Sequence, residues 1–219
     1  MKDDRINQFI DELNQTIAPN YQIIKDIFNR EYNYPELDPL RDEICKCLIC
    51  GLYQAAITLT NHLLESSLKK CLAMKYAITH KGNQIELKDA FKDGIAAYDS
   101  WNLNNTINEA HNLQLITATQ KELLHKFRAN YRNAYSHAEA AKIFKACHPK
   151  IKIISSENIS TYENFQKIAS EELDTEIPIR DFLPIQGIAQ AIFAQKDAVP
   201  YFIEIDNIIR DMLFQISLK

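Results

Sequence analysis

Two charged or titratable residues and an amide lie close together in the stretch YRNAYSHAE, residues 131–139, and could together act on a phosphodiester. Arg132 offers a planar set of donors that matches a phosphate and stays charged at any cellular pH. His137 titrates near neutrality and can accept or deliver a proton. Asn133 lies between them on the chain. The surrounding sequence otherwise has the apolar periodicity of an amphipathic helix.

An arginine and a histidine at this spacing are suited to cleaving RNA without a metal ion. A base removes the proton of a 2′-hydroxyl, the oxygen attacks the adjacent phosphorus, and a guanidinium stabilises the added negative charge. DNA lacks this hydroxyl, so the same chemistry leaves DNA intact. Spacing alone leaves a second interpretation open, in which Arg132 and His137 form a surface pair or a dimer contact.

The charge distribution favours a polyanion that binds at one place. The net charge of the chain is −4, but residues 121–152 hold eight lysines and arginines and only two acidic residues. A local basic segment on an acidic chain suits RNA that docks at one site. The alternative, a solvated helix face balanced by acids elsewhere, remains open from charge alone.

The helix that carries these residues is expected to begin after a cap at Thr117 or Thr119 and to end near residue 147, at the sequence CHPK. At 100° per residue, a polar arc lies opposite an apolar stripe. The arc comprises Arg132, Asn133, Ser136 and His137, and the stripe comprises Leu124, Phe127, Tyr131, Ala134, Tyr135 and Ala138. We predict that Ser136, Arg128 and Lys126 contact the substrate beside the catalytic residues. The other histidines lack a partnered arginine and are expected to be structural or solvated: His62, His80, His111, His125 and His148.

The whole chain, residues 1–219, is expected to form a single all-α domain. With only four glycines and seven prolines, long stretches have no turn residues, which favours long helices. Apolar periodicity predicts helices over 3–17, 20–32, 38–79, 117–147 and 187–218, with Pro19 at the start of the second. The prediction is a bundle of four or five main helices with insertions at about 80–116 and 148–186. The first insertion is expected to be less regular, with a short helix over 86–98 and another capped at Thr106, and the second to hold one strand-like run, IKIISSEN.

The helix predicted over 38–79 has two apolar stripes. One contains Ile44, Leu48, Leu52, Ala55, Leu59 and Leu63, and the other Tyr53, Ile57, Leu64 and Leu68. Such a helix is either central in a bundle or half core and half subunit interface. We expect a homodimer whose interface includes the second stripe and the motif helix.

No metal or other cofactor is expected. Cys45, Cys47 and Cys50 lie in CKCLIC, but Cys71 and Cys147 provide no second pair at a zinc-binding spacing, so reduced thiols are expected. The first residues are acidic where a signal peptide is basic, and no apolar run approaches the roughly 18 to 20 residues needed to cross a bilayer. A cytoplasmic protein without membrane contact is therefore expected.

The run RNAYSH resembles the signature of the HEPN superfamily, an arginine, a polar residue, three further residues and a histidine. Arg132, Asn133 and His137 match these positions in turn. Residues 51–72 are similar to the long family helix that carries an acidic residue late in its course, which is Glu65 here. We expect Glu65 to lie within reach of Arg132, or of its symmetry mate, and to orient the guanidinium. The alternative is a helix-surface acid that pairs with Lys69 at i,i+4. The resemblance covers roughly residues 40–79 and 117–147, about a third of the chain.

This resemblance implies a helical-bundle protein of prokaryotic toxin and phage-defence systems, often a metal-independent ribonuclease and generally a dimer with one composite site. It implies RNA as the substrate and an antitoxin or defence protein as a partner. Some members are controlled by modification of a tyrosine two residues after the histidine, but Glu139 occupies that position here. The predicted function is a metal-independent endoribonuclease. The alternative is a catalytically silent HEPN protein that binds RNA or a nucleotide or serves in assembly.

Overall fold

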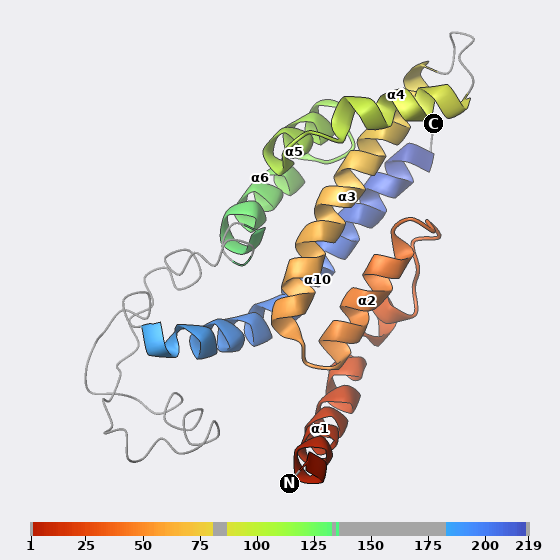
Figure 1. Cartoon of the computed structure of the whole chain (residues 1–219). Helices are drawn as coiled ribbons and strands as arrows, with labels where there is room; N and C mark the ends of the chain where they lie inside the picture. Colours follow the sequence, from red (N-terminus) through yellow and green to blue (C-terminus); the bar gives the residue numbers. More distant parts are fainter. Residues whose placement is uncertain (1, 81–86, 133–134, 136–182, 218–219) are drawn as a thin grey trace.

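A computed structural model describes the chain except residues 1, 81–86, 133–134, 136–182 and 218–219 (Figure 1). Its regular elements are all helices, and no strand occurs among the described residues, so the predicted all-α class is confirmed. The strand-like run IKIISSEN lies outside the described residues.

Helix α3 (Tyr53–His80) is the centre of the bundle. Four helices of the same chain pack against it: α2 (Asp38–Ile49), α4 (Leu87–Tyr98), α5 (Leu103–Asn112) and α10 (Leu183–Ser217). Figure 1 shows the C-terminal half of α10 running beside α3, with α2 on one side of this pair and α4 and α5 on the other. Because α3 is covered from several directions, it buries thirteen of its residues.

The second apolar stripe of α3 is not a subunit interface, which corrects the expectation from the sequence. Ile57, Leu64 and Leu68 are at most 1% exposed within the single chain. The neighbouring helices already cover these side chains, so a second copy cannot reach them. The two-sided pattern therefore marks a central helix, the other reading of such a pattern.

The single helix predicted over 38–79 is in fact two helices, α2 and α3, separated at Gly51. Gly51 has φ +74°, a left-handed conformation that suits glycine. The amide of Leu52 donates to the carbonyl of Cys47 (2.8 Å), and the amide of Gly51 to that of Leu48 (3.1 Å). These two bonds form a Schellman motif, which ends α2. The apolar spacing continues across the break, so periodicity alone did not reveal it.

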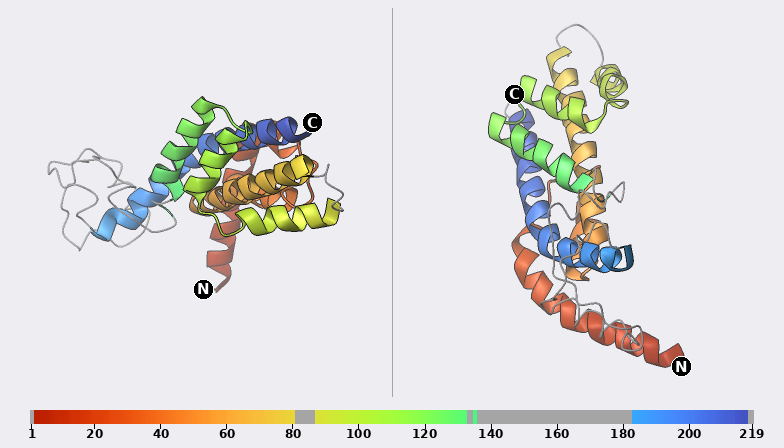
Figure 2. Two further views of the ribbon diagram at one scale, coloured as in Figure 1. Left: turned by 90° about the horizontal axis from the view of Figure 1, so that it is seen from above. Right: turned by 90° about the vertical axis from the view of Figure 1, so that its left-hand side faces the viewer.

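Two predicted N-terminal helices are one helix, α1 (Lys2–Phe28), with Pro19 inside it. A proline in a helix removes one backbone hydrogen bond and bends the helix, and α1 is visibly curved in Figure 2. Its C-terminal part packs against α2 and buries Ile24. Its N-terminal part projects away from the bundle (Figures 1 and 2).

Of the insertion predicted at 80–116, the part over residues 87–116 is more regular than expected and belongs to the main core. They form α4 and α5, which bury Ala90, Leu103, Ile107 and Ala110 against the rest of the bundle. A Cβ atom on Gly94 would lie 2.7 Å from the carbonyl oxygen of Ala73, so this glycine lets α4 approach α3 closely. The cap of α5 is Asn102, not Thr106, and the side chain of Asn102 accepts a bond from the amide of Asn105.

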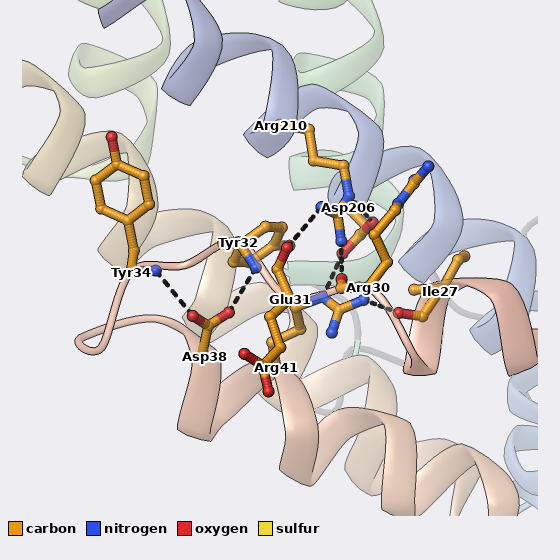
Figure 3. Close-up of polar contacts among 9 residues, drawn as sticks. All are labelled: Ile27, Arg30, Glu31, Tyr32, Tyr34, Asp38, Arg41, Asp206 and Arg210. Atoms are coloured by element: carbon orange, nitrogen blue, oxygen red, sulfur yellow. Dashed lines mark hydrogen bonds and ion pairs between the residues drawn. The ribbon is translucent and has the colours of Figure 1, made fainter. Parts of the chain in front are cut away.

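A buried ion-pair cluster joins α1, α2 and α10 (Figure 3). The carboxylate of Asp206 is fully buried and accepts a bond from Arg41 Nε through one oxygen and from Arg210 Nε through the other, both at 2.8 Å. Arg41 also donates to the carbonyl of Ile27 at the end of α1. The Asp206 carboxylate therefore fixes three helices relative to one another.

Tyr32 completes this cluster. The guanidinium carbons of Arg41 and Arg210 lie 5.1 Å and 4.8 Å from the centre of its ring. Burial, and then the negative charge of Asp206, raise the pKa of the Tyr32 hydroxyl, so it stays protonated. The amide of Tyr32 donates to Asp38 at the start of α2 (2.8 Å), which orders the connection between α1 and α2.

We expect Asp206→Ala to lower the free energy of unfolding by about 3–5 kcal/mol, because it leaves two arginines in the core without their carboxylate. Urea unfolding followed by circular dichroism measures the change. Asp42→Ala is the control, since Asp42 pairs with Lys46 on the solvent-exposed side of α2. Equal midpoints for the two variants would contradict the proposed role of Asp206.

Candidate functional site

The helix that leads to the predicted site is α6 (Ala118–Phe127), and it begins where the sequence indicated. Thr117 is its cap: the Thr117 hydroxyl accepts from the amide of Gln120 (3.2 Å), and the Gln120 side chain accepts from the amide of Thr117 (2.9 Å). The side chain of Gln120 also donates to Asp211 on α10 (2.7 Å). These contacts fix the start of α6 on the C-terminal half of α10.

A π-helical turn, η2 (Arg128–Arg132), follows α6 and was not predicted. Each residue of a π-turn advances by less than the 100° assumed for the motif helix, so a regular helical wheel does not give the angles within Arg128–Arg132. The turn packs against α3 and ends at Arg132. Such turns are frequent at functional sites because they redirect side chains.

Aromatic side chains anchor this turn to α10. The ring of Tyr131 stacks on Tyr201 with centroids 4.4 Å apart, and Phe127 meets the same ring edge-on at 5.0 Å. The hydroxyl of Tyr201 donates to Asn61 of α3 (2.7 Å, both buried). The predicted apolar stripe thus faces the core at its described residues Leu124, Phe127, Tyr131 and Tyr135, whereas Ala134 and Ala138 lie outside the described residues.

Arg132 reaches Glu65 of α3, as predicted for these two residues. Arg132 Nη2 lies 3.8 Å from Glu65 Oε2, and Lys69 Nζ lies 3.5 Å from Glu65 Oε1. The second contact is the i,i+4 helix pair that was the alternative interpretation of Glu65, so both interpretations describe contacts that exist. Arg132 is 34% exposed and Glu65 27% exposed, which leaves the guanidinium accessible to a ligand.

The partner of Glu65 is itself tied to the rest of the bundle. Lys69 Nζ donates to the carbonyl of Asp99, between α4 and α5 (2.7 Å). Asn61, Glu65 and Lys69 are spaced at i, i+4 and i+8, so they form one polar strip along α3. Tyr201 contacts this polar strip at Asn61 through its hydroxyl, and Arg132 contacts it one turn later at Glu65 through its guanidinium.

A row of basic residues runs along α6 and η2; the sequence predicted a local basic segment here, but not the place of His125 in it. Lys121, His125, Arg128 and Arg132 are spaced at i, i+4, i+7 and i+11, and each is only partly exposed. Burial, and then the positive charges of Arg128 and Lys121, lower the pKa of His125, so the three side chains share one face. His125 Nε2 lies 3.4 Å from Asn108 Oδ1 of α5. We name these four residues the basic row. Their spacing along the sequence could have indicated it, whereas the net charge of the segment could not.

Of the remaining predicted site residues, the structure describes Lys126 and Arg128. Lys126 is exposed on α6, one position away from the basic row. Arg128 belongs to the row, and its Nε atom is buried without a hydrogen-bond partner in the described part of the chain. Asn133, Ser136 and His137 lie outside the described residues, so their roles stay predictions.

The cysteines of the described ranges are free thiols. Burial raises the pKa of Cys45 to about 11 and that of Cys71 to about 12, so these two thiols are protonated at neutral pH and are poor nucleophiles and metal ligands. In the ranges that the structure describes, no three His, Cys, Asp or Glu side chains form a group that could hold a metal ion. Cys147 lies outside these ranges.

We expect Tyr131 to make the stability of the protein sensitive to alkaline pH. Burial, and then Asp197, raise the pKa of Tyr131 to about 12, whereas an unfolded tyrosine titrates near about 10. Stability from this group is therefore complete below pH 10 and is lost as the pH rises towards 12, by at most about 1.4 kcal/mol per pH unit. Urea unfolding between pH 9 and pH 11 measures the loss. Tyr131→Phe should show a shallower decline, and an unchanged decline would contradict the assignment.

Comparisons of the chain with protein-family models, with curated proteins and with solved structures give no match. No helix in the described ranges combines the length and the apolar character required to span a membrane. The contact between Arg132 and Glu65 and the basic row are thus the observations on which a functional proposal rests.

Proposed function

We propose that the chain is a metal-independent endoribonuclease of the toxin or phage-defence type, with a HEPN-like bundle that works as a cytoplasmic homodimer. The observation that carries the proposal is the contact between Arg132 and Glu65. The resemblance singles out these two residues from separate sequence segments, and a chance match of a short motif gives no reason for them to meet. An antitoxin or defence protein is the partner that this proposal implies.

In the proposed reaction, His137 removes the proton from a 2′-hydroxyl, and the oxygen forms a bond to the adjacent phosphorus. The bond from phosphorus to the 5′-oxygen breaks, and that oxygen takes up a proton, which leaves a cyclic phosphate and a 5′-hydroxyl. Arg132 stabilises the extra negative charge on the phosphorus oxygens. Glu65 is the positioning residue, because its carboxylate lies beside the guanidinium of Arg132, which is 34% exposed and can present further donors to a phosphate. Asn133 and Ser136 are proposed to contact the substrate at the same place.

The basic row offers a path for the rest of the strand. At 1.5 Å per residue, Lys121 lies about 10 Å from Arg128 along α6, enough to meet two successive phosphates of an extended strand, and Arg132 follows Arg128 in η2. The charged side chains of the row are partly covered by neighbouring helices, which holds them in place and lowers the entropy cost of binding. Lys126 contributes positive charge from the adjacent exposed surface.

One observation favours the alternative function, a silent HEPN protein that binds RNA or a nucleotide or serves in assembly. Glu65 is shared between Arg132 and Lys69, and a shared ion pair of this kind can also join helices without any chemistry. Only a measurement of RNA cleavage separates this alternative from the endoribonuclease, because both use the same fold and residues.

We expect the purified protein to cleave a mixed pool of single-stranded and loop RNA in excess chelator. His137→Ala and Arg132→Ala should each lower the rate by about a hundredfold or more, because a positioned base or a phosphate clamp is lost. His80→Ala and Arg30→Ala are the matched controls, since both side chains are exposed outside the site, and these variants should keep full activity. Cleavage that disappears with chelator, or that survives both site substitutions, would falsify this mechanism. If no RNA is cleaved, the silent alternative is favoured.

We expect Glu65→Gln to lower kcat by about tenfold with little change in KM, because a mobile guanidinium supports the transition state less well. Lys69→Met is the matched control, since it removes the other partner of Glu65 and leaves the carboxylate beside Arg132. Steady-state cleavage of a fluorescent RNA gives both constants. If the two variants lower kcat equally, Glu65 acts only through its helix pair with Lys69.

A further inference from the structure

The N-terminal part of α1, residues 2–19, is an amphipathic arm whose apolar side is left exposed by the part of the chain that the structure describes. Ile6 is 59% exposed, Phe9 58% and Ile10 46%. With Leu13 and Ile17 they recur every three or four residues, so they lie on one face of the helix. Figure 2 shows this arm extending beyond the bundle.

The apolar face of the arm is the same face that enters the core farther along α1. At 100° per residue, Ile24 and Ile27 continue the line of Leu13 and Ile17. Ile24 is 1% exposed, and Asn20 on this face donates to the carbonyl of Leu48 and to the hydroxyl of Tyr53, both at 2.9 Å. The bundle therefore covers the second half of one continuous apolar stripe and leaves the first half open.

A groove at the base of the arm extends this apolar surface. It has a volume of about 370 Å³ and is lined by Leu13 of the arm, Leu52 of the connection between α2 and α3, and Ile188 and Ile192 of α10. Leu52 is 54% exposed and Ile192 48% exposed. The arm and this groove form one surface that is contributed by three elements of the chain.

The charges of the arm favour a protein partner over a lipid surface. Helices that lie on membranes carry lysines and arginines on their polar side. The arm instead has four acidic residues, Asp3, Asp4, Asp11 and Glu12, against two basic residues, Lys2 and Arg5. The six large apolar side chains of the arm and groove that are more than a third exposed offer on the order of 600 Å². A stable interface buries about 800 Å² per partner, so this patch with its polar edge is large enough for one.

We propose that the arm docks on a second copy of this chain, in an antiparallel pairing of two arms about a two-fold axis. One molecule carries both the projecting arm and the groove at its base, which is the self-complementarity that a two-fold interface requires. Arg5 and Glu12 lie on the same edge of the helix, two turns apart. In an antiparallel pair, each Arg5 therefore lies opposite Glu12 of the other copy. The inference specifies the interface of the homodimer in the proposed function.

Sedimentation velocity at micromolar concentration tests this interface with matched substitutions. The unmodified protein should be a dimer, and Phe9→Ser and Ile10→Ser should each raise the dissociation constant about tenfold or more. Phe214→Ser is the control for Phe9, because both rings are 58% exposed. Ile23→Ser is the control for Ile10, because Ile23 is 61% exposed on another face of α1. Both controls should remain dimers.

Charge reversal tests whether the arm binds a second copy of the chain and whether the two arms are antiparallel. Arg5→Glu should weaken the dimer by placing like charges opposite each other, and Arg5→Glu combined with Glu12→Arg should restore it. An unmodified protein that is monomeric, controls that dissociate as readily as the arm variants, or no restoration by the double exchange would overturn the inference. Arm-dependent binding to anionic vesicles by a monomeric protein would overturn it in favour of a membrane. These assays measure only the oligomeric state. The proposed function is tested separately by RNA cleavage, so the two can fail independently.

Discussion

The need to cover α3 on nearly every side determines how the rest of the structure is arranged. Between Ala56 and Ile78, only Thr58 and His62 of this helix are exposed. Helices α2, α4, α5 and α10 of the same chain supply the cover, each facing a different part of its surface. The polar strip of Asn61, Glu65 and Lys69 interrupts the apolar surface, and buried polar groups require partners. Tyr201 provides one for Asn61, and Arg132 and Lys69 provide them for Glu65.

The candidate site is built on this strip. Tyr201 of α10 is held at Asn61 and stacks on Tyr131, so α10 fixes the π-turn that ends at Arg132. The carboxylate of Asp206, little more than one turn beyond Tyr201, joins the same helix to Arg41 of α2. The position of the guanidinium thus depends on packing and hydrogen bonds made by residues away from the guanidinium itself. A guanidinium held in this way is suited to stabilising charge that develops during a reaction.

The sequence was informative where the local signal was strong. Helical periodicity with few glycines predicted an all-α chain, and Thr117 was one of the two residues predicted to cap the start of α6. The resemblance singled out Glu65 and Arg132, which are in contact in the structure. The break at Gly51 was missed because apolar spacing continues across it, and a single glycine in a helical pattern is an ambiguous signal.

Other features depended on tertiary contacts that a single sequence does not contain. The stripe of Ile57, Leu64 and Leu68 was assigned to a second copy because nothing in the sequence shows that helices from the same chain cover it. Pro19 was taken as a helix start, although a proline is tolerated inside a long helix that its neighbours support. The π-turn over Arg128–Arg132 leaves no signal in the apolar spacing, because Tyr131 and Tyr135 face the core as they would in a regular helix.

The central claim is that a 2′-hydroxyl of the substrate is the attacking group and that the side chains of this protein activate it. The most direct measurement compares two oligonucleotides of identical sequence in excess chelator, one of RNA and one with 2′-deoxyribose at every position, and identifies the products by mass spectrometry. We expect fragments with a cyclic phosphate and a 5′-hydroxyl from the RNA, and an intact deoxyribose strand. Cleavage of both strands, or RNA fragments that carry a 5′-phosphate, would contradict it.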